Sequence, residues 1–139
     1  MNRRRRKKLS ARLVGAAGTG DSRGVAALLR AGADPAAADT YGCTPLYAAC
    51  VHGAAETARL LLAAGAPPDA ESAGLGSEGT PLCAAACWGH TDTVRALLAH
   101  GADPGRREDH GTGHTPLEWA TRGPYPETVA VLRAAGTAA

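Results

Sequence analysis

The sequence predicts an all-α solenoid of about four helix-turn-helix repeats, and two regularities of spacing support this fold class. The tripeptide Thr-Pro-Leu occurs at residues 44–46, 80–82 and 115–117, so the spacing is 36 and then 35 residues. A glycine follows each of these threonines by 21 residues, at Gly65, Gly101 and Gly136. Each interval holds two short helices. Because helices of two to three turns are not stable alone in water, they need neighbours of the same kind.

The third unit shows how one repeat is built. Thr80 can cap a helix through its side-chain oxygen, and Pro81 suits the first turn, where a backbone N–H has no helical partner. Leu82 begins an apolar face with the period of a helix, which ends at Gly89. A second apolar stripe follows and ends at Gly101, which can adopt the left-handed conformation of a helix C-cap.

In the same register, three columns of residues match across four copies, the first of which is degenerate and begins at Ala11. Two residues after each start stand Leu13, Leu46, Leu82 and Leu117. Five residues after it stand Ala16, Ala49, Ala85 and Ala120, and seventeen after it stand Leu28, Leu61, Leu97 and Leu132. We expect the leucines to fill the space between repeats and the alanines to let helices approach closely.

The first and last copies differ from the middle ones as end caps would. The first has Arg12 in place of the proline, and the fourth has Arg133 where the others have Leu29, Leu62 and Leu98. A terminal repeat has one face in water and therefore needs more polar residues there.

These units resemble ankyrin repeats. The family's T-P-L-H-x-A motif is present as TPLYAA, TPLCAA and TPLEWA, and the segments LLAAGA and LLAHGADP match its second helix and turn. The hallmark histidine is replaced by Tyr47, Cys83 and Glu118. The resemblance covers residues 9–136, with repeats at about 9–38, 39–70, 71–105 and 106–136, and implies short β-hairpin fingers between them. It also implies a non-enzymatic module without a cofactor, whose partner is another protein.

The resemblance places the binding surface on the finger tips and on the exposed face of each first helix. The matching positions hold Thr40, Tyr41, Cys43, Val51, His52, Cys87, Trp88, His114 and Arg122. We expect binding to centre on Tyr41, His52 and Trp88, because aromatic side chains are enriched in interface cores. The alternative for Trp88 is packing against a neighbouring repeat. Trp119 is expected to fill the core of the last unit.

A run of cations precedes the repeats and consists of Arg3, Arg4, Arg5, Arg6, Lys7 and Lys8. The rest of the chain has nine Lys and Arg against thirteen acids, so a basic tail adjoins a mildly acidic domain. Like charges repel, and residues 1–8 are therefore predicted to be disordered. Such a tail can serve solubility alone, or it can bind nucleic acid or an anionic membrane. The alternative function is thus a nucleic-acid-associated adaptor, although no aromatic residue lies among the cations to stack on bases.

The remaining residues give little sign of chemistry. Cys83 and Cys87 could share a helix face with other thiols or histidines nearby, but Cys50 falls in a small-residue core column, so we expect free thiols without metal. No arrangement typical of an enzyme, a small-molecule site or a phosphate-binding loop is present. The sequence also has no apolar run of the ~18–20 residues that a membrane span needs and no secretory signal. We expect a monomeric cytoplasmic protein with a frayed end at residues 137–139.

Overall fold

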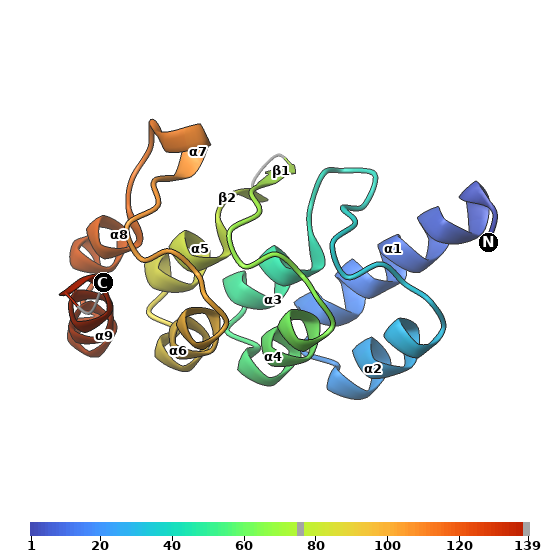
Figure 1. The fold of residues 1–139 in the computed structure, drawn as a ribbon, viewed down its shortest axis with the longest axis horizontal. Coiled ribbons are helices and arrows are strands. Elements are labelled where there is room, and N and C mark those ends of the chain that lie inside the picture. The colour runs from blue at the N-terminus through green and yellow to red at the C-terminus, as the bar shows by residue number, and fades with distance from the viewer. Residues whose placement is uncertain (75–76, 138–139) are drawn as a thin grey trace.

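The computed structural model describes residues 1–74 and 77–137, which form a row of stacked helix pairs (Figure 1). The first helices of the pairs are α1 (Arg3–Gly18), α3 (Pro45–Val51), α5 (Pro81–Cys87) and α8 (Pro116–Arg122). The second helices are α2 (Ser22–Arg30), α4 (Ala55–Ala63), α6 (Thr91–Ala99) and α9 (Pro126–Thr137). First helices pack on first helices of the next pair and second helices on second helices, which confirms the predicted all-α solenoid.

The repeated Thr-Pro motif fixes where three of the first helices begin. The hydroxyl oxygens of Thr44, Thr80 and Thr115 accept a hydrogen bond from the backbone N–H three residues later, at 3.2, 3.2 and 3.1 Å. At the start of α8, the Glu118 carboxylate also accepts the Thr115 N–H at 3.3 Å. This reciprocal capping box satisfies two N–H groups that the helix itself cannot pair.

The predicted leucine and alanine columns form the core between the repeats. The leucines of the two middle repeats are at most 2 % exposed: Leu46, Leu61, Leu82 and Leu97. Ala49 and Ala85 are fully buried between the first helices. Leu117 of the last repeat is only partly buried, as expected where a repeat has a neighbour on one side only.

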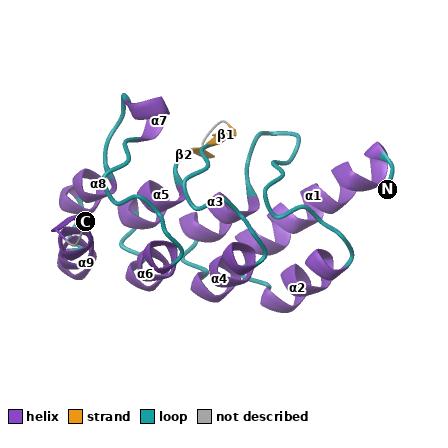
Figure 2. Cartoon of the chain, viewed as in Figure 1, coloured by secondary structure: helices purple, strands orange, loops and turns teal. Residues whose placement is uncertain are grey.

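Three segments between the helix pairs project to one side of the stack and are termed the fingers (Figures 1 and 2). The first finger, residues 34–42, consists of turns. The second, residues 67–79, contains the antiparallel strands β1 (Ser72–Gly74) and β2 (Ser77–Gly79), with Ser72 opposite Gly79. The third, residues 103–114, contains the single turn α7 (Glu108–Gly111). Within the described residues, strand pairing is thus confined to the second finger, whereas the sequence predicted a hairpin in each.

The second and third fingers are held together at an unusual turn. Asp109 and His110 adopt left-handed conformations, with φ of 51° and 54°. The Glu71 carboxylate of the second finger accepts the His110 backbone N–H at 3.1 and 3.2 Å, and one of its oxygens lies 2.9 Å from His110 Nδ1. Asp and His tolerate this conformation better than most residues do, and the contact with Glu71 stabilises it further.

The chain from Arg3 onward corrects the prediction of a disordered basic tail, because residues 3–8 form the first turns of α1. Asn2 caps this helix through its Oδ1, which accepts the Arg5 N–H at 2.9 Å. Leu9 and Leu13 are 7 % and 0 % exposed and fix the following turns against the stack. Arg and Lys are good helix formers, and a helix anchored by buried turns extends outward at little cost. Repulsion between like charges is therefore not enough to predict the conformation of residues 3–8.

The C-terminal end of the stack differs from the prediction in a smaller way. Helix α9 continues through Gly136 to Thr137, whereas the sequence pattern predicted Gly136 as a helix end. Fraying was predicted for residues 137–139, of which Thr137 is the last residue of α9 and residues 138–139 lie outside the described part.

Candidate functional site

The fingers and the exposed face of the first helices are together termed the ledge. A cavity of about 260 Å³ opens on the ledge where α5 and α8 meet the second and third fingers. This ledge cavity is lined by Tyr47, Glu78, Cys83, Ala84, Cys87, Trp88, Glu108, Asp109 and Trp119. It therefore joins side chains from three adjacent repeats and from two fingers.

Trp119 on α8 packs against the core, as predicted, and also forms one wall of the cavity. Its ring is partly buried, and its Nε1–H donates to Glu108 Oε1 at 2.7 Å. The equivalent positions of the two preceding repeats hold Ala48 and Ala84. Because alanine is enough to fill this place in the stack, the larger indole extends toward the third finger.

Two of the predicted binding residues gather around the same indole. The His114 ring lies edge-on to Trp119, with centroids 5.0 Å apart and an interplanar angle of 78°. The Arg122 guanidinium carbon lies 5.4 Å from the Trp119 ring centroid. His114 Nδ1 is also 3.0 Å from a Glu118 carboxylate oxygen. These contacts hold the Trp119 ring in place, although neither His114 nor Arg122 lines the cavity.

Tyr47 on α3 connects the base of the cavity with the second finger. It occupies the position of the motif histidine, and its hydroxyl donates to the Glu78 backbone carbonyl at 3.0 Å. Its side chain is mostly buried, and burial, followed by the charge of Glu108, raises the pKa of Tyr47 to about 12. The phenol is therefore protonated at neutral pH and acts as a fixed hydrogen-bond donor.

The thiols near the cavity are protonated as well. Burial raises the pKa of Cys83 to about 12, and its Sγ donates to the His114 backbone carbonyl at 3.5 Å. Burial and then Glu108 raise the pKa of Cys87, and burial raises the pKa of Cys50, which lies in the core as predicted. A neutral thiol is a poor nucleophile and metal ligand. Among residues 1–74 and 77–137, no three His, Cys, Asp or Glu side chains are placed to hold a metal ion.

Glu108 on α7 is the central acid of the cavity. Burial raises the pKa of its carboxyl, the hydrogen bond from Trp119 acts in the opposite direction, and the neighbouring Asp109 raises the pKa further. A raised pKa means that the folded protein disfavours the ionised carboxylate. Ionising Glu108 therefore costs the folded protein some stability.

Of the three residues expected at the centre of binding, the structure brings only Trp88 to the cavity. Trp88 is the C-cap residue directly after α5, is 59 % exposed and lies next to Cys87, another predicted residue. Tyr41 is 82 % exposed on the first finger, and His52 is exposed at the end of α3, but neither lines the cavity. Stacking therefore does not gather all three aromatic rings at one place.

The other predicted residues lie apart from the cavity. Val51 contributes its carbonyl oxygen, 3.0 Å from His90 Nε2, and so helps to join two repeats. Cys43 is partly buried at the base of the first finger. Thr40 lines a separate hollow with Arg3, Arg6 and Lys7, so the first finger lies beside the basic end of α1.

Sequence reasoning missed Tyr47, Glu108, Asp109 and Trp119 as parts of one site. Two signals could have found them. A tryptophan replaces the alanine of the two preceding repeats at position 119. The segment before the last repeat is also two residues longer than the first such segment, counted from the helix-ending glycine to the next threonine. An enlarged side chain below a lengthened finger indicates a specialised surface, because such changes are not needed for stacking.

The comparison with protein families agrees with this architecture. A family model described as ankyrin repeats (3 copies) matches residues 13–108 and 67–138. The chain therefore belongs to the ankyrin-repeat family. A comparison with curated proteins found no significant match.

Ankyrin repeats are in general protein–protein interaction modules, and their family is typically non-enzymatic. Within the described part of the chain, no helix has both the length and the apolar character that crossing a membrane demands.

Proposed function

We propose that this protein binds an extended segment of a partner protein along the ledge, with the ledge cavity at the centre of the contact. The observation that carries the proposal is the position of Trp88, which is 59 % exposed beside a cavity of about 260 Å³. A large exposed aromatic side chain next to a cavity is typical of an interaction site, where such residues supply most of the binding energy.

The fixed geometry of the fingers supports the same proposal. The Ala73 N–H donates to the Gly42 carbonyl at 3.1 Å, which joins the first and second fingers. The Asp103 N–H donates to Asp69 Oδ1 at 3.0 Å, which joins the second and third. A surface that is ordered before binding loses less conformational entropy when a partner docks.

The proposal can be tested by selecting phage-displayed random peptides on the immobilised full chain. The selected peptides are then measured against Trp88→Ala and, as a matched control, Tyr41→Ala, which removes an exposed aromatic ring outside the cavity. We expect Trp88→Ala to weaken binding by about 2 kcal/mol, or roughly thirtyfold, while Tyr41→Ala has a much smaller effect. Thermal melting should change little in both variants, because exposed side chains contribute about 0.5 kcal/mol or less to stability.

Two results would contradict the proposed function. Peptides that bind Trp88→Ala as tightly as the wild type use another face of the protein. A Trp88→Ala protein that no longer folds shows that the ring packs within the stack, which was the alternative interpretation of this residue.

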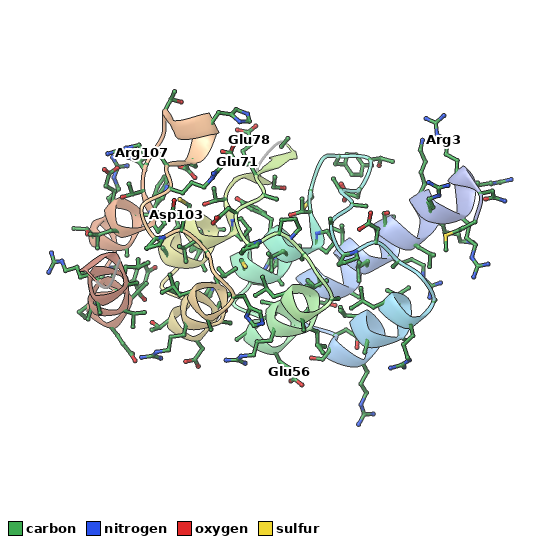
Figure 3. The ribbon with its side chains drawn as sticks, viewed as in Figure 1. Arg3, Glu56, Glu71, Glu78, Asp103 and Arg107 are labelled. Carbon is green, nitrogen blue, oxygen red and sulfur yellow. The ribbon has the colours of Figure 1, made fainter. Side chains whose placement is uncertain are left out.

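A second candidate function is the nucleic-acid-associated adaptor, and the basic end of α1 favours it. The side chains of residues 3–8 are exposed, and none of them takes part in an ion pair within the described part of the chain. Figure 3 shows Arg3 directed away from the stack at the end opposite the third finger. A cluster of free cations binds phosphate groups through counterion release, independently of the ledge.

We further propose that the protein acts as a monomer in the cytoplasm. The support is chemical: Cys50, Cys83 and Cys87 are free thiols, which persist in a reducing compartment. Sedimentation of the purified chain and fractionation of its host cells test these two points.

A further inference from the structure

The ledge cavity has a charge that its own lining does not balance. Three acidic residues line it, Glu78, Glu108 and Asp109, and no lysine or arginine is found among its lining residues in the described part of the chain. Arg107, on the same finger, is already engaged, because its guanidinium lies 3.2 Å from Glu118 Oε1 and donates to the Gly113 carbonyl at 3.1 Å. A ligand that enters the cavity therefore meets a negative field.

Aromatic rings form the other walls of the cavity. Trp88 and Trp119 come from adjacent first helices, and Tyr47 comes from the one before them. The Trp119 ring is fixed by its hydrogen bond to Glu108, so its position relative to the carboxylate is set before a ligand binds. The face of an indole ring is electron-rich and attracts cations, most strongly where water is excluded.

The protein itself shows that this indole attracts a guanidinium group. Arg122 places its guanidinium carbon 5.4 Å from the Trp119 ring centroid, a typical cation–π distance. Arg122 does not line the cavity, so its guanidinium does not occupy the place proposed for a ligand there. A planar guanidinium can lie on an aromatic ring and donate two parallel hydrogen bonds to a carboxylate, which an ammonium group cannot do.

From these observations we propose that the ledge cavity receives an arginine side chain of the partner segment, held between the Trp88 and Trp119 rings and paired with the carboxylates of Glu108 and Asp109. The inference rests on the proposed function, which it deepens by naming the residue that the partner supplies. Burial and neighbouring acids raise the pKa of Glu108, so the folded protein disfavours its ionised form. A bound cation stabilises that ionised form, which fits the proposal.

The proposal is tested with a blocked arginine as the probe. Nα-acetyl-L-arginine amide and its neutral isostere Nα-acetyl-L-citrulline amide are titrated into the full chain, and the indole N–H signals of Trp88 and Trp119 are followed by NMR. We expect arginine to shift both signals with an affinity at least tenfold tighter than that of citrulline. The lysine derivative should bind more weakly than arginine, because it lacks the planar fork.

Variants locate the binding site. Asp109→Asn is the preferred change, since asparagine tolerates the left-handed backbone at this position. Asp109→Asn and Glu108→Gln should each weaken arginine binding about threefold to tenfold. The matched control is Glu56→Gln, which neutralises an exposed carboxylate on α4 at the side of the stack away from the fingers (Figure 3). This control should bind arginine as the wild type does.

Several outcomes would overturn the inference: equal binding of arginine and citrulline, tighter binding of lysine than of arginine, signal shifts confined to other residues, or wild-type affinity in both carboxylate variants. The peptide selection separates this failure from that of the proposed function. Peptides that need Trp88 but bind equally well after Arg→citrulline replacement leave the ledge function intact and overturn the arginine assignment. Peptides indifferent to Trp88 contradict the proposed function itself.

Discussion

Thr91 Oγ1 lies 2.7 Å from Thr128 Oγ1, so a partly buried hydroxyl pair connects α6 with α9. The same relationship occurs at the other end of the stack, where Ser22 Oγ lies 3.5 Å from Thr57 Oγ1. Between them, Thr93 occupies the position equivalent to Thr57 and Thr128, and its buried Oγ1 has no hydrogen-bond partner among the described residues. The reason is that Ala55 stands where the first and third repeats have Ser22 and Thr91.

We predict that Ala55→Ser stabilises the protein by about 1 kcal/mol, because it supplies a partner to a buried hydroxyl. Ser is acceptable at this first position of α4. Urea unfolding gives the measurement. Ala63→Ser, an exposed position at the end of the same helix, is the control and should be neutral or slightly destabilising. If Thr93→Val destabilises the protein while Ala55→Ser has no effect, the hydroxyl is satisfied in another way.

The carboxyl groups of Glu108 and Glu118 should respond to pH with opposite signs. The pKa of Glu108 is raised, chiefly by burial, so the folded state holds this proton more tightly than the unfolded chain does. Its contribution to stability is full at acid pH and declines as pH rises through the raised pKa. We therefore predict that Glu108→Gln is more stable than the wild type at pH 7 and that this advantage disappears at a pH of about 3.5, below the usual glutamate value.

Glu118 is the matched control on the next element. Its pKa is lowered, first by the hydrogen bond with His114 and then by the Thr115 N–H and Arg107. Its contribution is present above the usual glutamate pKa and is lost as pH falls. Glu118→Gln should thus lose stability at neutral pH and match the wild type in acid. Urea midpoints at the two pH values decide, and equal pH profiles for both variants would refute the assignment.

A glycine between two helices of the third repeat should tolerate no side chain. Gly89 has a φ of 69°, and a Cβ there would collide with the Tyr125 ring of the next repeat. We predict that Gly89→Ala destabilises the protein by about 2 kcal/mol or more, since left-handed backbone strain and overpacking add. The control is Gly15→Ala, in the last turn of α1 with open space around it, which should stabilise by about 0.5–1 kcal/mol. Equal thermal melting of the two variants would contradict this prediction.

The stacking of the repeats could be predicted because it depends on local periodicity. Each column residue, such as Leu61 or Leu97, makes the same contact in successive repeats, so a pattern in the sequence maps directly onto burial in the structure. The start of α1 could not be predicted from charge, because its helicity depends on the Asn2 cap and on buried Leu9 further along. Repulsion between neighbouring cations is screened by solvent and is small beside these terms.

The ledge cavity could be predicted only in part, because some of its residues lie in irregular segments and not in the periodic helices. Trp88 stands at a position whose equivalents in the first two repeats, Thr19 and His52, are also exposed, so the register alone places it on the ledge. Glu108 and Asp109 lie in a finger whose turn has left-handed residues and is fixed by Glu71 from another finger. Such a contact between irregular segments has no periodic signal in the sequence.

The cations at the N-terminal end of α1 lie where positive charge destabilises a helix. The N-terminus of a helix carries a partial positive charge, yet the first turn of α1 contains Arg3 and Arg4 and no acid. We predict that Arg3→Glu/Arg4→Glu stabilises the protein by about 1 kcal/mol at low salt, since each favourable charge is worth roughly 0.3–1 kcal/mol there, and that the gain shrinks at high salt.

The same variant should bind double-stranded DNA more weakly, with a salt dependence lower by about two for two lost phosphate contacts. Arg59→Glu, an exposed charge reversal on α4, is the control and should leave both properties nearly unchanged. Higher stability with unchanged DNA binding would remove the nucleic-acid alternative, whereas unchanged stability would show that the helix does not extend to Arg3 in solution.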